Sequence, residues 1–328
     1  MYLSFLVSAF LAFSLSLGLS LLVRKYAIRL QIIDLPNDRS NHTLPTPRGG
    51  GIGIVCVIIL FLLMVTPYVL DGFTGFWITS IILVAGIGWL DDQVSLSSWL
   101  RLIFQTVGAL IFLLSPNFLS VFQSTGIFAF ICITLLMVWL TNLYNFMDGI
   151  DGLAASQGMV AAIAASVFFY LSGQVVYSYL CCGLAAAIAG FLVVNWHPAK
   201  IFMGDVGSYG LGFMFACLAL LGQLTNSVPI LVWLVLLAVF ISDATFTLVH
   251  RVLKGETWYR AHCDHAYQRL VRSGFSHKKV TMAVLIINII LLWPLAYLSW
   301  SNPEFAPWIV VSLYLVAWFC WYRIIQKN

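Results

Sequence analysis

Residues 124–172 read STGIFAFICITLLMVWLT, then NLYNFMDGIDG, then LAASQGMVAAIAASVFFYLS. The first and last parts are apolar and uncharged, and each has about the 20 residues that a helix needs to cross a bilayer. The eleven residues between them, 142–152, carry two asparagines, two aspartates and two glycines. This stretch therefore predicts two membrane-spanning helices that are joined by a polar segment at one membrane face.

The whole chain repeats this pattern. Of its 328 residues, 62% are hydrophobic and 9% are charged, whereas a soluble domain has roughly 25% charged residues. The sequence predicts an all-α, polytopic transmembrane bundle that forms one integral membrane domain, residues 1–328. We expect about eleven spans, near 3–23, 51–70, 76–90, 102–120, 124–141, 153–172, 176–195, 208–223, 228–249, 280–300 and 307–322.

The basic residues indicate the orientation of these spans. All sixteen Lys and Arg residues fall in or beside alternate loops, and such loops face the cytoplasm. The predicted topology is N-terminus outside and C-terminus inside. The net charge of +4 reflects this bias and is no evidence for nucleic-acid binding. The inside segments are 24–50, 91–101, 142–152, 196–207, 250–279 and 323–328.

The 142–152 segment is the strongest candidate for a functional site. Asn142, Asn145, Asp148 and Asp151 recur every three residues, so they share one face if the helix continues. The glycines could instead open a loop. Four such groups beside two long apolar runs are hard to explain as a solvated surface, which favours function.

Two further acidic motifs lie in inside segments. Asp91 and Asp92 follow an apolar run, and Asp205 and Ser208 stand where the eighth run begins. Carboxylates there are costly unless they are paired or bind a metal, and hard oxygen ligands suit Mg²⁺. The alternatives are a helix end for the Asp pair and a helix N-cap for Asp205.

Three other features carry weaker signals. Glycines 49–51 and 53, beside Arg48, allow close approach to a phosphate, or they simply pack a helix against its neighbours. His262 and His265 lie in a basic segment that suits a diphosphate or anionic lipid. Asp243 lies within an apolar run, where a carboxylate indicates function or a structural hydrogen bond.

In this order, the motifs resemble those of the polyprenyl-phosphate N-acetylhexosamine-1-phosphate transferases of the glycosyltransferase family 4 type. The stretches that carry the resemblance are Pro-Asn-Asp-Arg-Ser…His…Pro-Thr-Pro-Arg-Gly-Gly-Gly, Asp91-Asp92, Asn142 to Leu153, Phe202-Met-Gly-Asp205-Val-Gly-Ser208, and His262-Cys-Asp-His265. The resemblance implies transfer of a sugar-1-phosphate from a UDP-sugar to undecaprenyl phosphate, with release of UMP, and a requirement for Mg²⁺ or Mn²⁺.

The resemblance also implies roles for single residues. Asn145 and Asp205 would hold the metal. Asp91 and Asp92 would lie at the lipid phosphate, and Asp148 and Asp151 near the nucleotide and the reacting phosphates. The residues expected to contact substrate are Asn37, Arg39, His42, Arg48, Asn142, Ser208, Asp243, Arg260, His262 and His265.

The implied partners are a UDP-N-acetyl amino sugar, undecaprenyl phosphate and the lipid bilayer. The implied location is the bacterial cytoplasmic (inner) membrane, with the site facing the cytoplasm. The His262-Cys-Asp-His265 segment, followed by Ala-Tyr-Gln-Arg, resembles most the branch that initiates O-antigen synthesis. Gln93 departs from the acid or lysine that many relatives carry shortly after the Asp pair. The sugar and the oligomeric state stay open, with a homodimer among the possibilities.

The charge of the acceptor bears on the mechanism, and the placement of the polar groups bears on the class of protein. A phosphate monoester is largely a dianion at pH 7, so direct attack by the lipid phosphate is favoured over a covalent phospho-sugar intermediate on an Asp. Asp91 or Asp92 would orient the acceptor or take a residual proton. The alternative class is a transporter of an anionic solute, but that needs polar groups through the membrane midplane.

Overall fold

The computed structural model describes residues 2–36, 44–65, 73–256 and 262–326. Within these ranges the chain is almost entirely helical, as the composition predicts, and its one sheet pairs two short antiparallel strands, β1 (Ile33–Asp34) and β2 (Thr46–Pro47). The helices are α1 (Tyr2–Arg29), α2 (Ile52–Val65), α3 (Phe73–Val94), α4 (Ser98–Leu113), α5 (Pro116–Phe146), α6 (Leu153–Leu171), α7 (Val175–Asn195), α8 (Gly204–Leu224), α9 (Ile230–Leu236), α10 (Ala238–Leu253), α11 (Ala266–Arg272), α12 (His277–Ile286), the π-helical turn η2 (Ile287–Leu292), α13 (Trp293–Ser301) and α14 (Ala306–Gln326).

Each of the eleven predicted spans contains helix. Eight helices of the described chain are long and apolar enough to cross a membrane, and the α9–α10 pair, bent by 81°, makes a ninth candidate. The other two, α2 and α4, are apolar but have only 14 and 16 residues. A 14-residue helix is about 21 Å long, which is shorter than the ~30 Å hydrocarbon core. The number of spans and their orientation therefore stay predictions.

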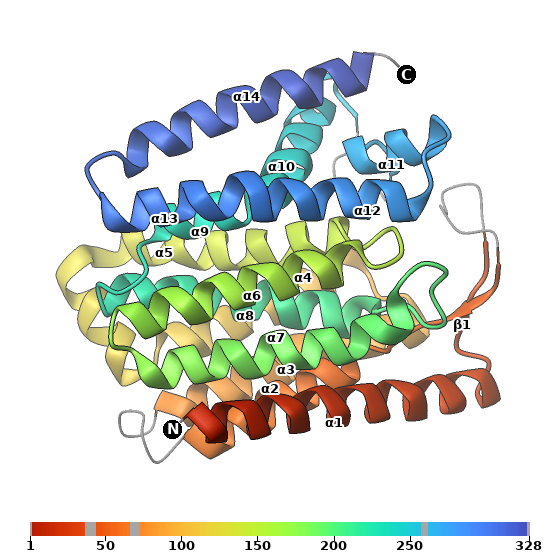
Figure 1. Cartoon of the computed structure of the whole chain (residues 1–328), viewed down its shortest axis with the longest axis horizontal. Coiled ribbons are helices and arrows are strands. Elements are labelled where there is room, and N and C mark those ends of the chain that lie inside the picture. Colours follow the sequence, from red (N-terminus) through yellow and green to blue (C-terminus); the bar gives the residue numbers. More distant parts are fainter. Residues whose placement is uncertain (1, 37–43, 66–72, 257–261, 327–328) are drawn as a thin grey trace.

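Helix α8 occupies the centre of the bundle and packs against α3 and α5 (Figure 1). Its span is 83% buried inside the protein, whereas the span of the peripheral helix α14 is 11% buried. Glycines permit the close contacts of α8. A Cβ on Gly212 would lie 2.8 Å from the Cα of Thr141 in α5. Small residues let helix backbones approach closely, which is how apolar helices pack in lipid.

The bend between α9 and α10 is stabilised by a buried polar pair. Gln157 of α6 and Asn288 of η2 exchange hydrogen bonds of 3.1 and 2.8 Å, and Gln157 also donates to the carbonyl of Leu236 at 2.9 Å. A bent helix loses backbone hydrogen bonds that no water replaces in a bilayer. The pair supplies a donor at the break and links α6, α9 and η2.

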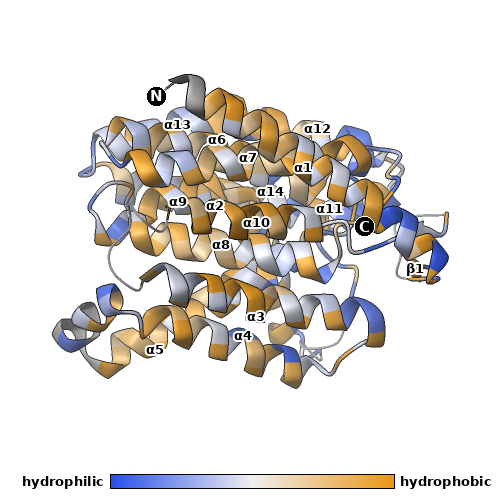
Figure 2. Ribbon diagram, turned by 90° about the horizontal axis from the view of Figure 1, so that it is seen from below, coloured by the Kyte–Doolittle hydropathy of each residue, from blue (hydrophilic) through white to orange (hydrophobic). Residues whose placement is uncertain are grey.

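Hydrophobic residues fill the middle of the helices, and hydrophilic residues lie at the two ends of the bundle (Figure 2). One end gathers segments that are far apart in sequence. The amide of Phe202, just before α8, donates to Pro47 of β2, and the hydroxyl of Tyr267 in α11 donates to the carbonyl of Phe146 at the end of α5. All five polar motifs of the sequence have their described residues at this end or on the helices that lead to it.

Candidate active site

Asp92 joins α3 to the first turn of α8. Its Oδ1 accepts the backbone N–H of Asp205 at 3.0 Å, and its Oδ2 accepts that of Val206 at 3.3 Å. The first N–H groups of a helix lack partners within it, and a carboxylate there is favoured by the helix dipole. Gly88, one turn earlier in α3, makes this approach possible, because a Cβ there would lie 2.5 Å from the carbonyl oxygen of Asp205.

Asn145, near the end of α5, faces the same turn of α8. Its side-chain amide nitrogen donates to Oδ1 of Asp205 and to the hydroxyl of Ser208, both at 2.9 Å. Asp205 and Ser208 are three residues apart in α8 and so share a face. The structure thus brings together two residues that the resemblance assigns to the metal, from motifs 60 residues apart in the chain.

Asp91 and Arg101 form the neighbouring ion pair. Nη1 of Arg101 in α4 lies 3.1 Å from Oδ2 of Asp91 and 4.0 Å from Oδ2 of Asp205, and it donates to the hydroxyl of Tyr209 at 3.3 Å. The other oxygen of Asp91 accepts the amide of Leu96. Both carboxylates of the Asp pair are therefore occupied within the protein, and Arg101 adds the positive charge that a phosphate needs. Arg101 was not singled out from the sequence.

This donor set fits a hard divalent cation. Mg²⁺ binds in proteins through one or two carboxylates together with substrate oxygens. Asp205 provides a carboxylate that has 26% of its side chain exposed, and Asn145 provides an amide oxygen that has no hydrogen-bond partner among the described residues. Arg101, at 4.0 Å, is the only cation that the described chain pairs with Asp205. A net negative oxygen cluster at a helix start is consistent with Mg²⁺ or Mn²⁺.

Asp148 lies in the segment between α5 and α6, residues 147–152, which we call the 147–152 loop. The sequence left open whether the helix continues here; it ends at Phe146, and Gly152 adopts φ +72°. Asp148 is half-buried, and no described residue donates a hydrogen bond to its carboxylate. Burial, and then the charges of Asp205, Asp92 and Asp151, raise the pKa of Asp148 well above its ordinary value.

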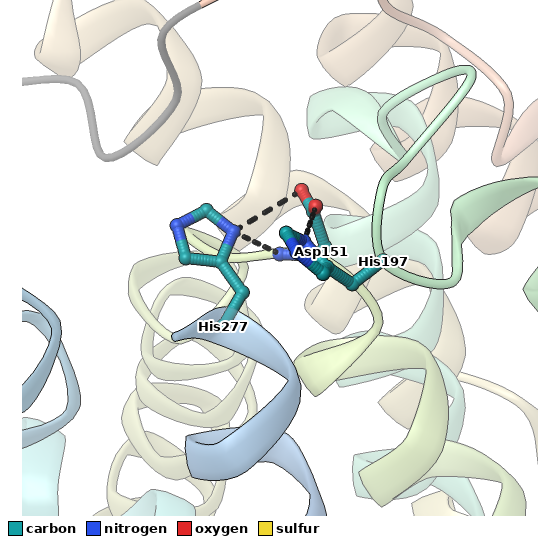
Figure 3. Close-up of side chains that lie close together, drawn as sticks. All are labelled: Asp151, His197 and His277. Atoms are coloured by element: carbon teal, nitrogen blue, oxygen red, sulfur yellow. Dashed lines mark hydrogen bonds and ion pairs between the residues drawn. The ribbon is translucent and has the colours of Figure 1, made fainter. Parts of the chain in front are cut away.

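Asp151, at the other end of the loop, is buried, and its carboxylate is hydrogen-bonded within the protein (Figure 3). Its Oδ2 lies 2.6 Å from Nδ1 of His197 and accepts the amide of Ala199 at 3.2 Å, and its Oδ1 lies 3.4 Å from Nδ1 of His277. Burial would raise the pKa of Asp151, but the hydrogen bonds from His277 and His197 outweigh it and lower this pKa. Neither histidine was singled out from the sequence, where the only signal is that His197 lies just before the Asp205 motif.

The glycine run beside Arg48 is explained mainly by packing. A Cβ on Gly51 would lie 2.3 Å from the Cα of Gly207 in α8, and the amides of Gly50 and Gly51 donate to the carbonyls of Phe202 and Met203 at 2.9 Å. Those amides are therefore not free for a phosphate. The Nε atom of Arg48 is buried, and no described residue accepts a hydrogen bond from it, which keeps Arg48 a candidate anion ligand.

Asp243 organises the segment that carries the histidines. Its two oxygens accept the amides of Ala266 and Tyr267 at 2.8 and 3.1 Å, so Asp243 caps the start of α11. This is the structural alternative that the sequence left open. His265 lies 3.7 Å from the same carboxylate and stacks on Phe146 of α5.

His262 lies beside His265, with ring centroids 4.9 Å apart. Burial, and then the neighbouring His265 and Arg251, lower the pKa of His262 to about 4. The imidazole is therefore neutral at pH 7 and suits a hydrogen bond to a sugar better than an ion pair. Asp264 pairs with Arg251 and Arg269, which neutralises part of the basic cluster.

Asn142 has a structural partner. Its amide donates to Oε1 of Gln105 in α4 at 2.6 Å and to the carbonyl of Val138, and it thereby links α5 to α4. A direct contact of Asn142 with substrate stays a prediction. Four predicted substrate residues lie outside the described chain: Asn37, Arg39, His42 and Arg260.

Comparison with known proteins identifies the family. Residues 73–223 match the model of glycosyl transferase family 4. The chain is 32% identical over 281 residues to a probable undecaprenyl-phosphate N-acetylglucosaminyl 1-phosphate transferase of Bacillus subtilis, covering 82% of this chain and 77% of that protein. It is 28% identical over 336 residues to a decaprenyl-phosphate N-acetylglucosaminephosphotransferase of Mycobacterium tuberculosis (90% and 82% covered), and 27% identical over 342 residues to the undecaprenyl-phosphate alpha-N-acetylglucosaminyl 1-phosphate transferase of Escherichia coli (98% and 90% covered). The matched region contains Asp91, Asn145 and Asp205, and the chain belongs to glycosyl transferase family 4, the polyprenyl-phosphate N-acetylhexosamine-1-phosphate transferases.

Proposed function

We propose that this protein transfers an N-acetylhexosamine-1-phosphate from a UDP-sugar to undecaprenyl phosphate, releases UMP and requires Mg²⁺. The observation that carries the proposal is the convergence of Asp92, Asn145 and Asp205 on the first turn of α8, beside Arg101. The names of the bacterial relatives support a polyprenyl phosphate acceptor and favour N-acetylglucosamine as the sugar. Family membership favours this enzyme over a transporter.

The reaction exchanges one phosphoric anhydride for another. An oxygen of the lipid phosphate attacks the β-phosphorus of the UDP-sugar, and the bond from this phosphorus to the oxygen shared with the α-phosphate breaks, so that UMP leaves. A divalent cation held by Asn145 and Asp205 would neutralise charge on the diphosphate and on the departing UMP. The chain's own task is to hold two anions together, and Arg101 is placed to offset their repulsion.

No strong base is required, because the acceptor phosphate is already largely a dianion at pH 7. Asp91 and Asp92 are engaged with Arg101 and with the amides of α8, so they act best by fixing Arg101 and Asp205 in place. Asp148 is the carboxylate of the site that no described residue engages. We assign to it the contact with the reacting phosphates and any residual proton of the acceptor.

The test is UMP release by the purified protein in detergent, with undecaprenyl phosphate, Mg²⁺ and a panel of UDP-sugars that includes UDP-N-acetylglucosamine and UDP-N-acetylgalactosamine. We expect UMP and a lipid-linked sugar whose mass identifies the donor, and a loss of at least 100-fold in Asp205→Asn. No UMP with any donor would overturn the proposal. Labelled enzyme after incubation with β-³²P-UDP-sugar and no acceptor would overturn direct attack.

The predicted setting follows from the same donor. UDP-sugars are made in the cytoplasm, so we place the site at the cytoplasmic face of a bacterial inner membrane, in the topology with the C-terminus inside. The product would start a lipid-linked glycan, O-antigen or another cell-envelope polysaccharide. Accessibility labelling of a cysteine placed at Lys279, in the basic α11–α12 region, tests this orientation: reaction in intact cells with an impermeant maleimide would contradict it.

A further inference from the structure

Asp151 is contacted by the protein through both its carboxylate and its backbone. The carboxylate lies within hydrogen-bonding distance of Nδ1 of His197, Nδ1 of His277 and the backbone amide of Ala199. Nδ1 of His277 lies 3.4 Å from the backbone amide of Asp151 as well, so it accepts from that amide when it is unprotonated and donates to the carboxylate when it is protonated. The backbone carbonyl of Asp151 accepts the hydroxyl of Thr281 at 3.0 Å. The residue is 7% exposed. A buried carboxylate that already accepts hydrogen bonds from the protein is suited to hold the protein together and has less capacity left for a substrate.

The partners of Asp151 come from two segments that are distant in sequence (Figure 3). His197 and Ala199 precede α8, and His277 and Thr281 lie in the first turns of α12. Asp151 itself comes just before α6. Helices α6 and α12 also pack directly against each other, and the buried carboxylate with its donors adds a polar link that ties the 147–152 loop to both distant segments.

The same loop is held at two other points. The amide of Gly152 donates to Oδ1 of Asn195 at 3.1 Å. On the other side, a Cβ on Gly149 would lie 2.2 Å from the hydroxyl of Tyr267 in α11, and that hydroxyl donates to Phe146 at the start of the loop. The backbone on both sides of Asp148 is therefore fixed, while the carboxylate of Asp148 itself has no donor among the described residues.

We propose that His197 and His277 are positioning residues that act through Asp151 to hold the 147–152 loop and keep Asp148 beside Asp92 and Asp205. This inference rests on the proposed function, because it assigns Asp148 to the reacting phosphates. The charges of Asp205 and Asp92 act on Asp148, so the position of the 147–152 loop sets how Asp148 faces the first turn of α8. The sequence predicts a catalytic role for Asp151, whereas this inference assigns it the structural role of holding the 147–152 loop in place.

A metal ion is the competing explanation for the same three side chains, because their ligand atoms lie within 4.8 Å of one another. Geometry favours the hydrogen-bonded clamp. Oδ2 of Asp151 already accepts two donors, and its 2.6 Å separation from Nδ1 of His197 is that of a short charge-assisted hydrogen bond. Two ligands of one ion at about 2.1 Å lie roughly 3 Å or more apart.

The test uses the fact that both histidines contact Asp151 through Nδ1. The amide nitrogen of asparagine can take the place of Nδ1, whereas that of glutamine reaches the position of Nε2. We therefore compare His277→Asn, His277→Gln and His277→Ala, and the same set at His197. His250→Asn is the matched control, because His250, in α10, packs against Trp321 of α14. In the described chain, no hydrogen bond, ion pair or ring contact joins His250 to Asp151 or to the two histidines.

Three quantities are measured on the full-length protein in detergent: kcat and KM for the UDP-sugar, hydrogen–deuterium exchange of peptides that span residues 147–152, and the bound metal content by elemental analysis. We expect kcat to fall roughly 10- to 100-fold in His277→Ala, which corresponds to the loss of one hydrogen bond to a carboxylate. KM should change less than about threefold, because the histidines do not touch substrate. Exchange in the loop should become faster, and Asn should restore more activity than Gln.

Four results in the histidine variants would overturn the inference. A rise in KM at constant kcat would place Asp151 on the substrate, and a stoichiometric transition metal that is lost in His277→Ala would show a metal site. Unchanged hydrogen exchange of the loop, or faster exchange with unchanged kcat, would show that the histidines do not act through the loop. Hydrogen exchange needs no turnover. If the wild-type protein releases no UMP, the proposed function fails by itself, while loop exchange still reports whether the histidines hold the loop.

Discussion

The contact between Gly88 and the start of α8 gives the sharpest test of how the site is built. In Gly88→Ala, the new Cβ would lie 2.5 Å from the carbonyl oxygen and 2.6 Å from the carbonyl carbon of Asp205, and both are backbone atoms that cannot rotate away. Ordinary contact begins near 3.4 Å, so α3 and α8 must separate by about 0.9 Å, the difference between 3.4 and 2.5 Å.

That separation acts directly on Asp92, four residues further along α3. Its bonds to the amides of Asp205 and Val206, at 3.0 and 3.3 Å, would lengthen to about 4 Å, beyond hydrogen-bonding range. Each hydrogen bond to a charged group contributes roughly 1.5–3 kcal/mol. Asp205 would also move by nearly 1 Å relative to Asn145 on α5, and a displacement of that size costs on the order of 100-fold in rate.

The assay is UMP release, read together with the thermal unfolding midpoint in the same detergent. Gly86→Ala is the matched control, because Gly86 lies in the same helix with nothing within 4 Å of its Cβ position, and alanine there should be neutral or mildly stabilising. We expect Gly88→Ala to lose about 100-fold in kcat/KM and several degrees in Tm. Activity of Gly88→Ala within twofold of Gly86→Ala would refute the reasoning.

Three further predictions concern the cation, the loop and the bend. Chelation with EDTA should abolish UMP release and Mg²⁺ or Mn²⁺ should restore it, with half-restoration shifted to higher Mg²⁺ in Asp205→Glu; activity that persists in EDTA would contradict the cation site. The pKa of Asp148 is raised in the folded protein, whereas in the unfolded chain it is about 4. Asp148 therefore lowers the stability of the folded protein as the pH rises above about 4. Asp148→Asn should therefore melt a few degrees higher than wild type at pH 7.5 in EDTA, with the difference shrinking toward pH 4.5, and should be inactive; an equal or lower Tm at pH 7.5 would argue against this charge repulsion. Gln157→Leu and Asn288→Leu should each lower Tm, because each leaves its partner unpaired and so lowers the free energy of unfolding by roughly 1–3 kcal/mol. The double variant should lose less free energy of unfolding than the sum of the two single variants; strict additivity would show that the pair does not act as a unit.

The sequence was informative about the helices because membrane insertion acts on each segment separately. An apolar run of the required length forms a helix whatever its neighbours are, and each of the eleven predicted segments contains one. Boundaries were less well predicted. The 228–249 run contains the 81° bend between α9 and α10, and no proline or glycine lies at the junction near Leu237 to signal it.

The site shows the same division. The motif residues Asp92, Asn145 and Asp205 could be selected from their residue types and positions, because carboxylates beside apolar runs are rare and costly. The roles of other motif residues could not be predicted from residue type and position. Asp243 caps α11, and the amides of the glycine run are bonded to the segment before α8. In both cases a side chain or backbone group that could have met a ligand meets a distant part of the chain.

The sequence by itself determined that this is an all-helical membrane protein with its chemistry gathered in a few polar segments, because hydrophobicity and charge act locally. Only the tertiary structure decided which of those groups remain free. Asp151 and Asp148 are indistinguishable within DGIDG, yet the carboxylate of Asp151 is enclosed by His197 and His277, whereas no described residue donates a hydrogen bond to the carboxylate of Asp148. That distinction depends on how α8 and α12 pack against α5 and α6, which no local pattern encodes.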